Sequence, residues 1–258
     1  MIHCILSFLL LAAMESAMEN NFKAQFDGTT QKYTLCLPAE FNANKAHDLL
    51  IAFHGHASDR RQYIKDNRGE CKGARDVAAK HSMIYVSPDY RGNSWMGPAA
   101  EADMVQLIGE LKTKYKIARV FLVGGSMGGT SALIFTALHP NLVDGVSSQN
   151  GIADLTTYRQ SFAGIDAAIQ ASYGKDTAEY RKRSPVFFPE KFTMPVAITV
   201  GEKDNIVPPA STLRLAEAIQ KKGNKNVLVI ARKNGGHATN YDDTVKALEF
   251  VIERAKKK

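Results

Sequence analysis

The stretch Arg119–His139, RVFLVGGSMGGTSALIFTALH, is the most informative part of the sequence for the fold and contains a candidate reactive centre. It begins as a short apolar run typical of a strand buried on both faces, turns at GGSMGG and continues as a helical pattern. A serine in G-x-S-x-G spacing at such a junction has its hydroxyl exposed above the sheet edge. The tight turn needs small neighbours, which Gly124, Gly128 and Gly129 supply. We therefore predict Ser126 as a nucleophile; a glycine-rich helix entry with a capping serine is the alternative.

Apolar strand-like runs alternate with helical patterns along the rest of the chain. The predicted strands are 33–37, 49–53, 83–87, 120–123, 143–147, 196–200 and 227–231. The predicted helices cover about 73–80, 99–115, 127–138, 209–222 and 242–256. This alternation predicts an α/β fold with a mostly parallel sheet, helices on both faces and a ligand site at one sheet edge. Residues 150–192 interrupt it, and we expect either a helical excursion near the site or an ordinary crossover with an extra helix.

Two further residues follow strands at the same predicted edge. Asp204 lies in the loop after strand 196–200, and His237 lies in a glycine-rich loop after the last strand. A serine hydroxyl needs a base, usually a histidine oriented by a carboxylate. The order Ser, Asp, His is the one found with this nucleophile motif. We predict Ser126, Asp204 and His237 as a catalytic triad, with Glu202 as the rival carboxylate.

The loop HGHASD after the second predicted strand is the candidate for the oxyanion hole. A tetrahedral intermediate needs two donors aimed at its oxygen. We predict the backbone N–H of Met127 and that of His56, with Ala57 as the second choice for the latter. A metal bound by His54 and His56 is the alternative, although no third ligand with matching spacing is evident.

Three other side chains follow predicted strands and are expected to bind substrate: Trp95, Asn150 and Tyr158. The indole of Trp95 could stack on a sugar or an aromatic acid, or it could anchor its own loop. We expect no metal and no organic cofactor, because a serine triad needs neither.

Several motifs together resemble the α/β-hydrolase superfamily, and within it the prolyl-oligopeptidase-like group and related small serine esterases. They are HGHAS at 54–58, PDYRG at 88–92, GGSMGG at 124–129, SP at 184–185, PVAITVGEKDNIVP at 195–208 and GGH at 235–237. The resemblance covers nearly the whole chain after about residue 30. It implies an α/β-hydrolase fold with an eight-stranded, mostly parallel sheet, no large cap domain, and the same triad by motif match.

The departures from that group favour an esterase. The chain has no room for the N-terminal propeller of the large peptidases and lacks an obvious acidic pair to grip a peptide amino terminus. We expect a serine hydrolase that cleaves carboxylic esters through an acyl-enzyme, with feruloyl or acetyl esters of plant polysaccharides as candidate substrates. A serine peptidase acting on small peptides is the alternative. A non-catalytic binding protein is disfavoured because all three triad positions are filled.

Composition limits the partners. The hydrophobic share is 45% and the charged share 23%, ordinary for a globular protein. The net charge of +7 comes without a basic stripe interleaved with aromatics, so nucleic-acid binding is disfavoured. We expect a small-molecule or saccharide ester as the partner and no stable membrane insertion. The oligomeric state stays open.

The N-terminus suggests export. Residues 5–14 are apolar except for Ser7, too few to cross a bilayer but enough for a signal peptide. We predict a signal peptide at 1–17 and one catalytic domain at 18–258, and therefore a secreted or periplasmic protein. The alternatives are an N-terminal element packed on the domain or a misplaced start codon. In either of these cases the protein would be cytoplasmic. Cys36 and Cys71 would then form a disulfide or remain two buried thiols.

Overall fold

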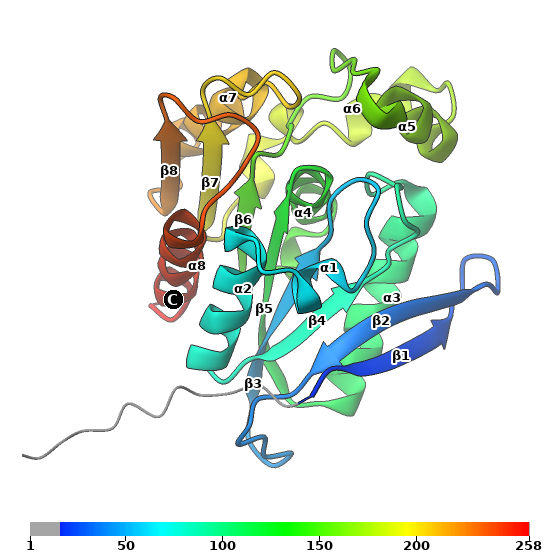
Figure 1. Ribbon diagram of the computed structural model, residues 1–258, viewed down its shortest axis with the longest axis vertical. Helices are drawn as coiled ribbons and strands as arrows, with labels where there is room; N and C mark the ends of the chain where they lie inside the picture. The colour runs from blue at the N-terminus through cyan, green and yellow to red at the C-terminus, as the bar shows by residue number, and fades with distance from the viewer. Residues whose placement is uncertain (1–15, 258) are drawn as a thin grey trace, which may run out of the picture.

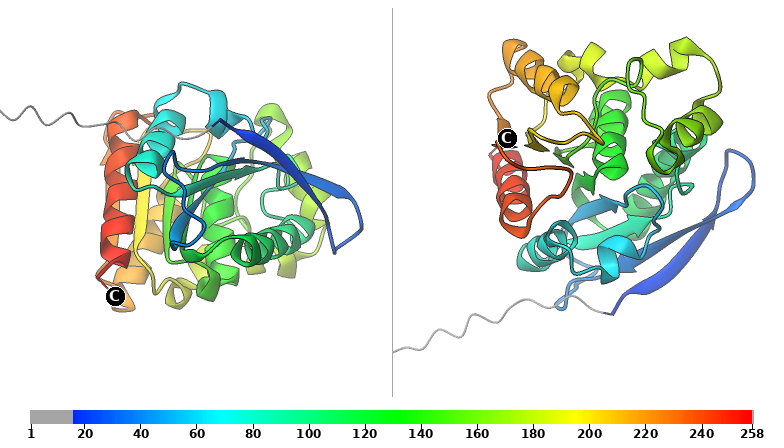
Figure 2. Two further views of the ribbon diagram at one scale, coloured as in Figure 1. Left: turned by 90° about the horizontal axis from the view of Figure 1, so that it is seen from below. Right: turned by 45° about the horizontal axis from the view of Figure 1, so that its top comes forward.

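The computed structural model describes residues 16–257, which build one eight-stranded sheet between two layers of helices (Figures 1 and 2). The strands are β1 (Met18–Lys23), β2 (Thr30–Cys36), β3 (His47–Phe53), β4 (Ile84–Pro88), β5 (Ile117–Gly125), β6 (Gly145–Gln149), β7 (Val196–Gly201) and β8 (Val227–Arg232). Their order in the sheet is β1-β2-β4-β3-β5-β6-β7-β8. The β1–β2 and β2–β4 pairs are antiparallel, and the remaining pairs are parallel. The predicted eight-stranded, mostly parallel α/β fold is therefore confirmed.

The central strands are apolar because both of their faces are covered. Along β3, Leu49, Ile51 and Phe53 pack into one cluster, and Leu50 and Ala52 pack into the other. The first cluster lies against α3 (Pro98–Lys114), α4 (Met127–Leu138) and α7 (Ala210–Lys221), and the second against α2 (Gly69–Lys80) and α8 (Tyr241–Ala255). All five residues have no exposed surface, so the sheet that carries the site is anchored from both sides.

Segment 150–192 lies near the carboxyl ends of the strands and carries α5 (Ile165–Tyr173) and α6 (Thr177–Lys182) (Figure 1). Arg183, which has no exposed surface, holds it in place. Its guanidinium donates to the carbonyl of Met96 at 2.6 Å and to the carboxylates of Glu179 and Glu101 at 2.6 and 2.5 Å. A buried arginine is stable only while its charge is paired. The contacts with Met96 and Glu101 therefore hold the segment against α3.

Neither β1 nor α1 (Gln62–Lys65) was predicted from the sequence. β1 has the polar sequence MENNFK, because it is an edge strand in which Phe22 alone is buried. The short helix α1 has too few residues for a periodic signal. The predicted signal peptide at 1–17 lies, except for residues 16 and 17, outside the described residues.

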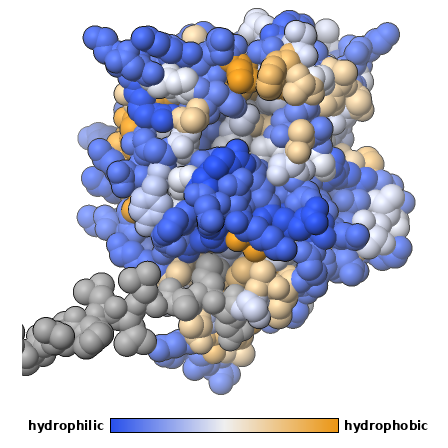
Figure 3. Space-filling model, in the orientation of Figure 1, coloured by the Kyte–Doolittle hydropathy of each residue, from blue (hydrophilic) through white to orange (hydrophobic). Residues whose placement is uncertain are grey.

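One face of the molecule is mainly hydrophilic, with scattered apolar side chains (Figure 3). Within residues 16–257 we find no helix that is both long and apolar enough to span a bilayer.

Cys36 and Cys71 are free thiols, both buried. The second alternative of the sequence analysis, two buried thiols, is therefore the correct one.

Candidate active site

Ser126 occupies the turn between β5 and α4 with φ 57° and ψ −120°. Such a conformation costs a non-glycine residue on the order of 1–3 kcal/mol and persists only where its surroundings enforce it. A Cβ on Gly128 would lie 2.1 Å from the carbonyl oxygen of Phe53, and one on Gly124 would lie 2.4 Å from the carbonyl carbon of Gly128. The turn therefore needs both glycines, and it presents the Ser126 hydroxyl to the cavity above the sheet.

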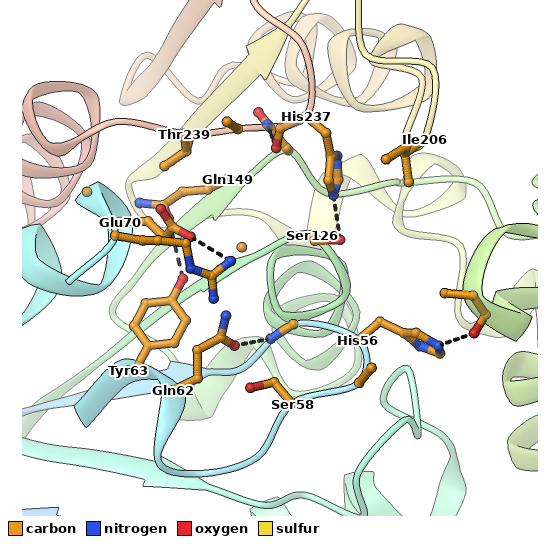
Figure 4. Close-up of a pocket in the computed structure, with 18 of the residues that line it drawn as sticks. His56, Ser58, Gln62, Tyr63, Glu70, Ser126, Gln149, Ile206, His237 and Thr239 are labelled. Atoms are coloured by element: carbon orange, nitrogen blue, oxygen red, sulfur yellow. Dashed lines mark hydrogen bonds and ion pairs between the residues drawn. The ribbon is translucent and has the colours of Figure 1, made fainter. Parts of the chain in front are cut away.

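The structure brings Ser126, Asp204 and His237 together, as predicted (Figure 4). The Nε2 atom of His237 lies 2.9 Å from Ser126 Oγ, and its Nδ1 lies 2.7 Å from Asp204 Oδ2. The other oxygen of Asp204 accepts from the backbone N–H groups of Ile206 and Val207, at 3.0 and 2.9 Å. Its side chain is 1% exposed. A carboxylate held this way fixes the orientation of the imidazole.

The rival carboxylate Glu202 is exposed to solvent. Asn150 lines the cavity, as expected of a substrate contact; its Nδ2 is already engaged, whereas its Oδ1 is buried with no hydrogen-bond partner among the described residues. It donates from Nδ2 to the carbonyl of His237 at 2.6 Å, while its own N–H donates to Thr199 O at 2.8 Å. Asn150 thus ties the histidine loop to β7.

The two amides predicted for the oxyanion hole are free for that role. Met127 is the first residue of α4, and the N–H of such a residue has no acceptor inside the helix. The His56 N–H donates to no acceptor within the part of the chain that the structure describes. The second choice, Ala57, is wrong, because its N–H donates to Asn93 Oδ1 at 2.7 Å.

The side chain of His56 links this loop to two other segments. The indole N–H of Trp95 donates to His56 Nδ1 at 3.3 Å, so the ring proton of neutral His56 lies on Nε2. That nitrogen is 3.0 Å from the carbonyl oxygen of Ala163 in segment 150–192. His56 therefore couples the placement of its own amide to the segment that covers the site.

Two predicted substrate contacts are wrong. Trp95 has no exposed surface, so its indole anchors the loop and cannot stack on a ligand. Tyr158 is 7% exposed, its hydroxyl donates to the carbonyl of Ile206 at 2.9 Å, and it does not line the cavity at Ser126. Burial raises the pKa of Tyr158, which keeps this hydroxyl a donor.

The metal alternative at His54 and His56 finds no support in the geometry. His54 is buried, with Nδ1 2.8 Å from Gly55 O and Nε2 3.1 Å from Asp89 O. Burial lowers the pKa of His54, so its neutral ring donates to one of these carbonyls. Among residues 16–257, no group of three or more His, Cys, Asp or Glu side chains is arranged to hold a metal ion.

Ser126 and His237 open onto a cavity of about 770 Å³ with two unlike ends. One end is apolar: Phe162, Ala163, Ile165 and Ile206. The other is polar: Ser58, Gln62, Tyr63, Arg68 and Glu70. Figure 4 shows Gln62, Tyr63 and Glu70 across Ser126 from Ile206. Neither end was predicted, because side chains scattered over loops and the first turns of separate helices form no sequence motif.

Comparisons with known proteins assign the chain to a family. The model of the prolyl oligopeptidase family matches residues 72–254. The chain belongs to the prolyl oligopeptidase family. This family member is a hydrolase of the serine type, as the resemblance of its motifs predicted. No curated protein matches it in sequence.

Solved structures show the same fold. An S-formylglutathione hydrolase from Agrobacterium tumefaciens is 14% identical with a TM-score of 0.71, covering 94% of this chain and 98% of the other. A ferulic acid esterase is 16% identical with a TM-score of 0.69, covering 93% and 98%. A structure assigned as a dipeptidyl aminopeptidase IV from Bacteroides ovatus is 16% identical with a TM-score of 0.72. The alignment covers 95% of this chain but only 36% of that aminopeptidase.

Proposed function

We propose that this protein hydrolyses carboxylic esters through an acyl-enzyme formed on Ser126. The observation that carries the proposal is the unbroken chain of contacts at the site. Ser126 Oγ lies 2.9 Å from His237 Nε2, and His237 Nδ1 lies 2.7 Å from Asp204 Oδ2. A hydroxyl at hydrogen-bond distance from an oriented imidazole can lose its proton as it attacks a carbonyl carbon.

The reaction has two halves. As Ser126 Oγ bonds to the acyl carbon, its proton passes to His237 Nε2, and the N–H groups of Met127 and His56 stabilise the negative oxygen. The intermediate collapses with departure of the alcohol, which takes the proton from His237. A water molecule then gives a proton to the same nitrogen and attacks the acyl carbon. The bond from that carbon to Ser126 Oγ breaks, Oγ takes the proton back from His237, and the acid is released. Asp204 stabilises the imidazolium that forms in both halves.

Two observations favour esters over peptides. The alignment spans 98% of the ferulic acid esterase but 36% of the aminopeptidase, so the fold of this chain matches nearly all of that esterase and only part of the aminopeptidase. The cavity joins an apolar end at Phe162 and Ile206 to a polar end at Gln62 and Glu70, which suits an ester of an apolar acid with a hydrophilic alcohol. Feruloyl and acetyl esters of plant polysaccharides fit this description.

The family match supports a second candidate, a serine peptidase acting on small peptides. A panel of p-nitrophenyl acyl esters, methyl ferulate, acetylated xylan and aminoacyl-nitroanilides separates the two. The esterase proposal predicts a higher kcat/KM for at least one ester than for every nitroanilide. Nitroanilide hydrolysis faster than that of all the esters would establish the peptidase instead.

A further inference from the structure

Arg68 and Glu70 form a polar pair on the cavity wall beside the nucleophile turn. A Cβ on Gly125, the residue before Ser126, would lie 3.9 Å from Glu70 Cγ. Glu70 is thus in van der Waals reach of the turn, and Figure 4 shows it facing the same space as Ser126. Neither side chain has a part in the proposed acyl transfer.

This pair has unused hydrogen-bonding capacity. The side chain of Glu70 is 13% exposed, and its oxygens accept no hydrogen bond from any residue that the structure describes. The nearest cationic atom is Arg68 Nη1, at 3.6 Å. The Nε–H of Arg68 donates to Asp66 Oδ2 at 2.7 Å, and its terminal amino groups donate no hydrogen bond to any residue that the structure describes. The side chain of Arg68 is 54% exposed, whereas that of Glu70 is mostly shielded from water. A shielded carboxylate normally has hydrogen-bond partners, so the free acceptor sites of Glu70 point to a ligand.

The neighbouring groups identify the kind of ligand. Gln62 accepts the Gly55 N–H with Oε1 at 2.7 Å, so its side-chain NH₂ is available as a donor. Carboxylate acceptors and guanidinium and amide donors therefore line one end of the cavity. Asp66 and Glu70 carry two negative charges against the single positive charge of Arg68, which disfavours a lone carboxylate, and an ammonium on Glu70 would lie beside the Arg68 guanidinium, whose Nη1 is 3.6 Å away. A hydroxyl both donates and accepts, and adjacent hydroxyls can bridge Glu70 and Arg68.

We propose that Arg68 and Glu70 form a subsite that binds the vicinal hydroxyls of a saccharide in the alcohol half of the ester. The inference rests on the proposed esterase function and narrows its substrate class to esters of neutral sugars. The apolar end at Phe162 and Ile206 then takes the acyl group.

The test compares two acetyl esters with different alcohols, 4-nitrophenyl acetate and mono-acetylated methyl β-xylopyranoside. The measured quantity is the ratio of their kcat/KM values, glycoside over phenyl ester. The variants are Glu70→Gln and Arg68→Met, so that one remains if the other fails to fold. Arg61→Met is the matched control, because Arg61 bonds to Asp59 through the same N–H and Nε contacts but does not line the cavity.

The subsite predicts that either variant lowers the ratio roughly tenfold to a hundredfold, through a higher KM for the glycoside, since hydrogen bonds to charged groups are lost. Arg61→Met leaves it unchanged. A ratio unchanged in both cavity variants overturns the inference. The inference is also overturned if the parent enzyme cleaves the phenyl ester but not the glycoside. Either of these two results leaves the esterase proposal intact. If the parent chain cleaves no ester and no fluorophosphonate labels Ser126, the proposed function itself fails, and the inference with it.

Discussion

The substitution Asp204→Asn isolates the role of the carboxylate. Asparagine keeps the shape, and its Oδ1 can still accept from the amides of Ile206 and Val207, 3.0 and 2.9 Å away in the parent structure. Its Nδ2 then faces His237 Nδ1 in place of an oxygen at 2.7 Å. An amide nitrogen only donates, so the imidazole must carry its proton on Nε2, the nitrogen 2.9 Å from Ser126 Oγ. In that tautomer it cannot accept the proton of the serine.

The size of the effect follows from this change of tautomer. The wrong tautomer in a Ser-His-Asp triad lowers kcat about 10⁴-fold. At about 1.4 kcal/mol per factor of ten, this is roughly 5 to 6 kcal/mol of transition-state stabilisation. The folded state loses one charge-assisted hydrogen bond, but no buried amide loses its acceptor. The variant should therefore fold while its turnover falls.

The assay is steady-state hydrolysis of 4-nitrophenyl acetate, with thermal unfolding as the check on folding. Glu202→Gln is the matched control, because Glu202 lies two residues earlier in the same loop and is exposed. We expect its kcat to stay within about twofold of the parent. If Asp204→Asn kept more than about a tenth of the parent kcat, the assignment of the carboxylate would be refuted.

The remaining predictions concern three other places. His56→Leu keeps the backbone amide but removes the acceptor of the Trp95 indole N–H, so kcat should fall roughly tenfold or more with little change in KM. An unchanged kcat would show that the side chain of His56 does not position its amide. Burial raises the pKa of Cys36 to about 11 and that of Cys71 to about 12, so a thiol reagent at pH 8 should label neither thiol until the chain is unfolded in urea. Burial disfavours the ionised form of Glu101, but its hydrogen bonds to His139 and Arg183 outweigh burial and lower its pKa to about 2. The ionised carboxylate therefore contributes its full stability to the fold above about pH 4.5, and this contribution is lost as the pH falls from about 4.5 to 2. The difference in melting temperature between the parent and Glu101→Gln should shrink across that range, and a constant difference would argue against it.

The residues of the candidate triad could be predicted because each follows a strand. Ser126 comes after an apolar run and between glycines, and Asp204 and His237 lie in loops after two later runs of the same kind. In a parallel sheet these loops meet at one edge, so local patterns determine a long-range arrangement. The strand pattern itself was clear wherever both faces of a strand are buried, as in β3.

The substrate side could not be predicted in the same way. A tryptophan in a loop after a strand gives the same pattern whether it is exposed or fully buried, and Trp95 is buried. Arg183 has the sequence context of a surface residue, yet three acceptors and complete burial make it an anchor of the site. Arg68 and Glu70 face the cavity because of where α2 begins, which depends on the packing of the whole sheet.

The most direct test of the account is to trap the acyl-enzyme. The protein is mixed with excess 4-nitrophenyl acetate, quenched in acid during turnover, digested and examined by mass spectrometry. We predict one acetyl group on the peptide that contains Ser126, and neither acetylation nor ester hydrolysis in Ser126→Ala. An acetyl group on a different residue, or undiminished hydrolysis by Ser126→Ala, would contradict the central claim.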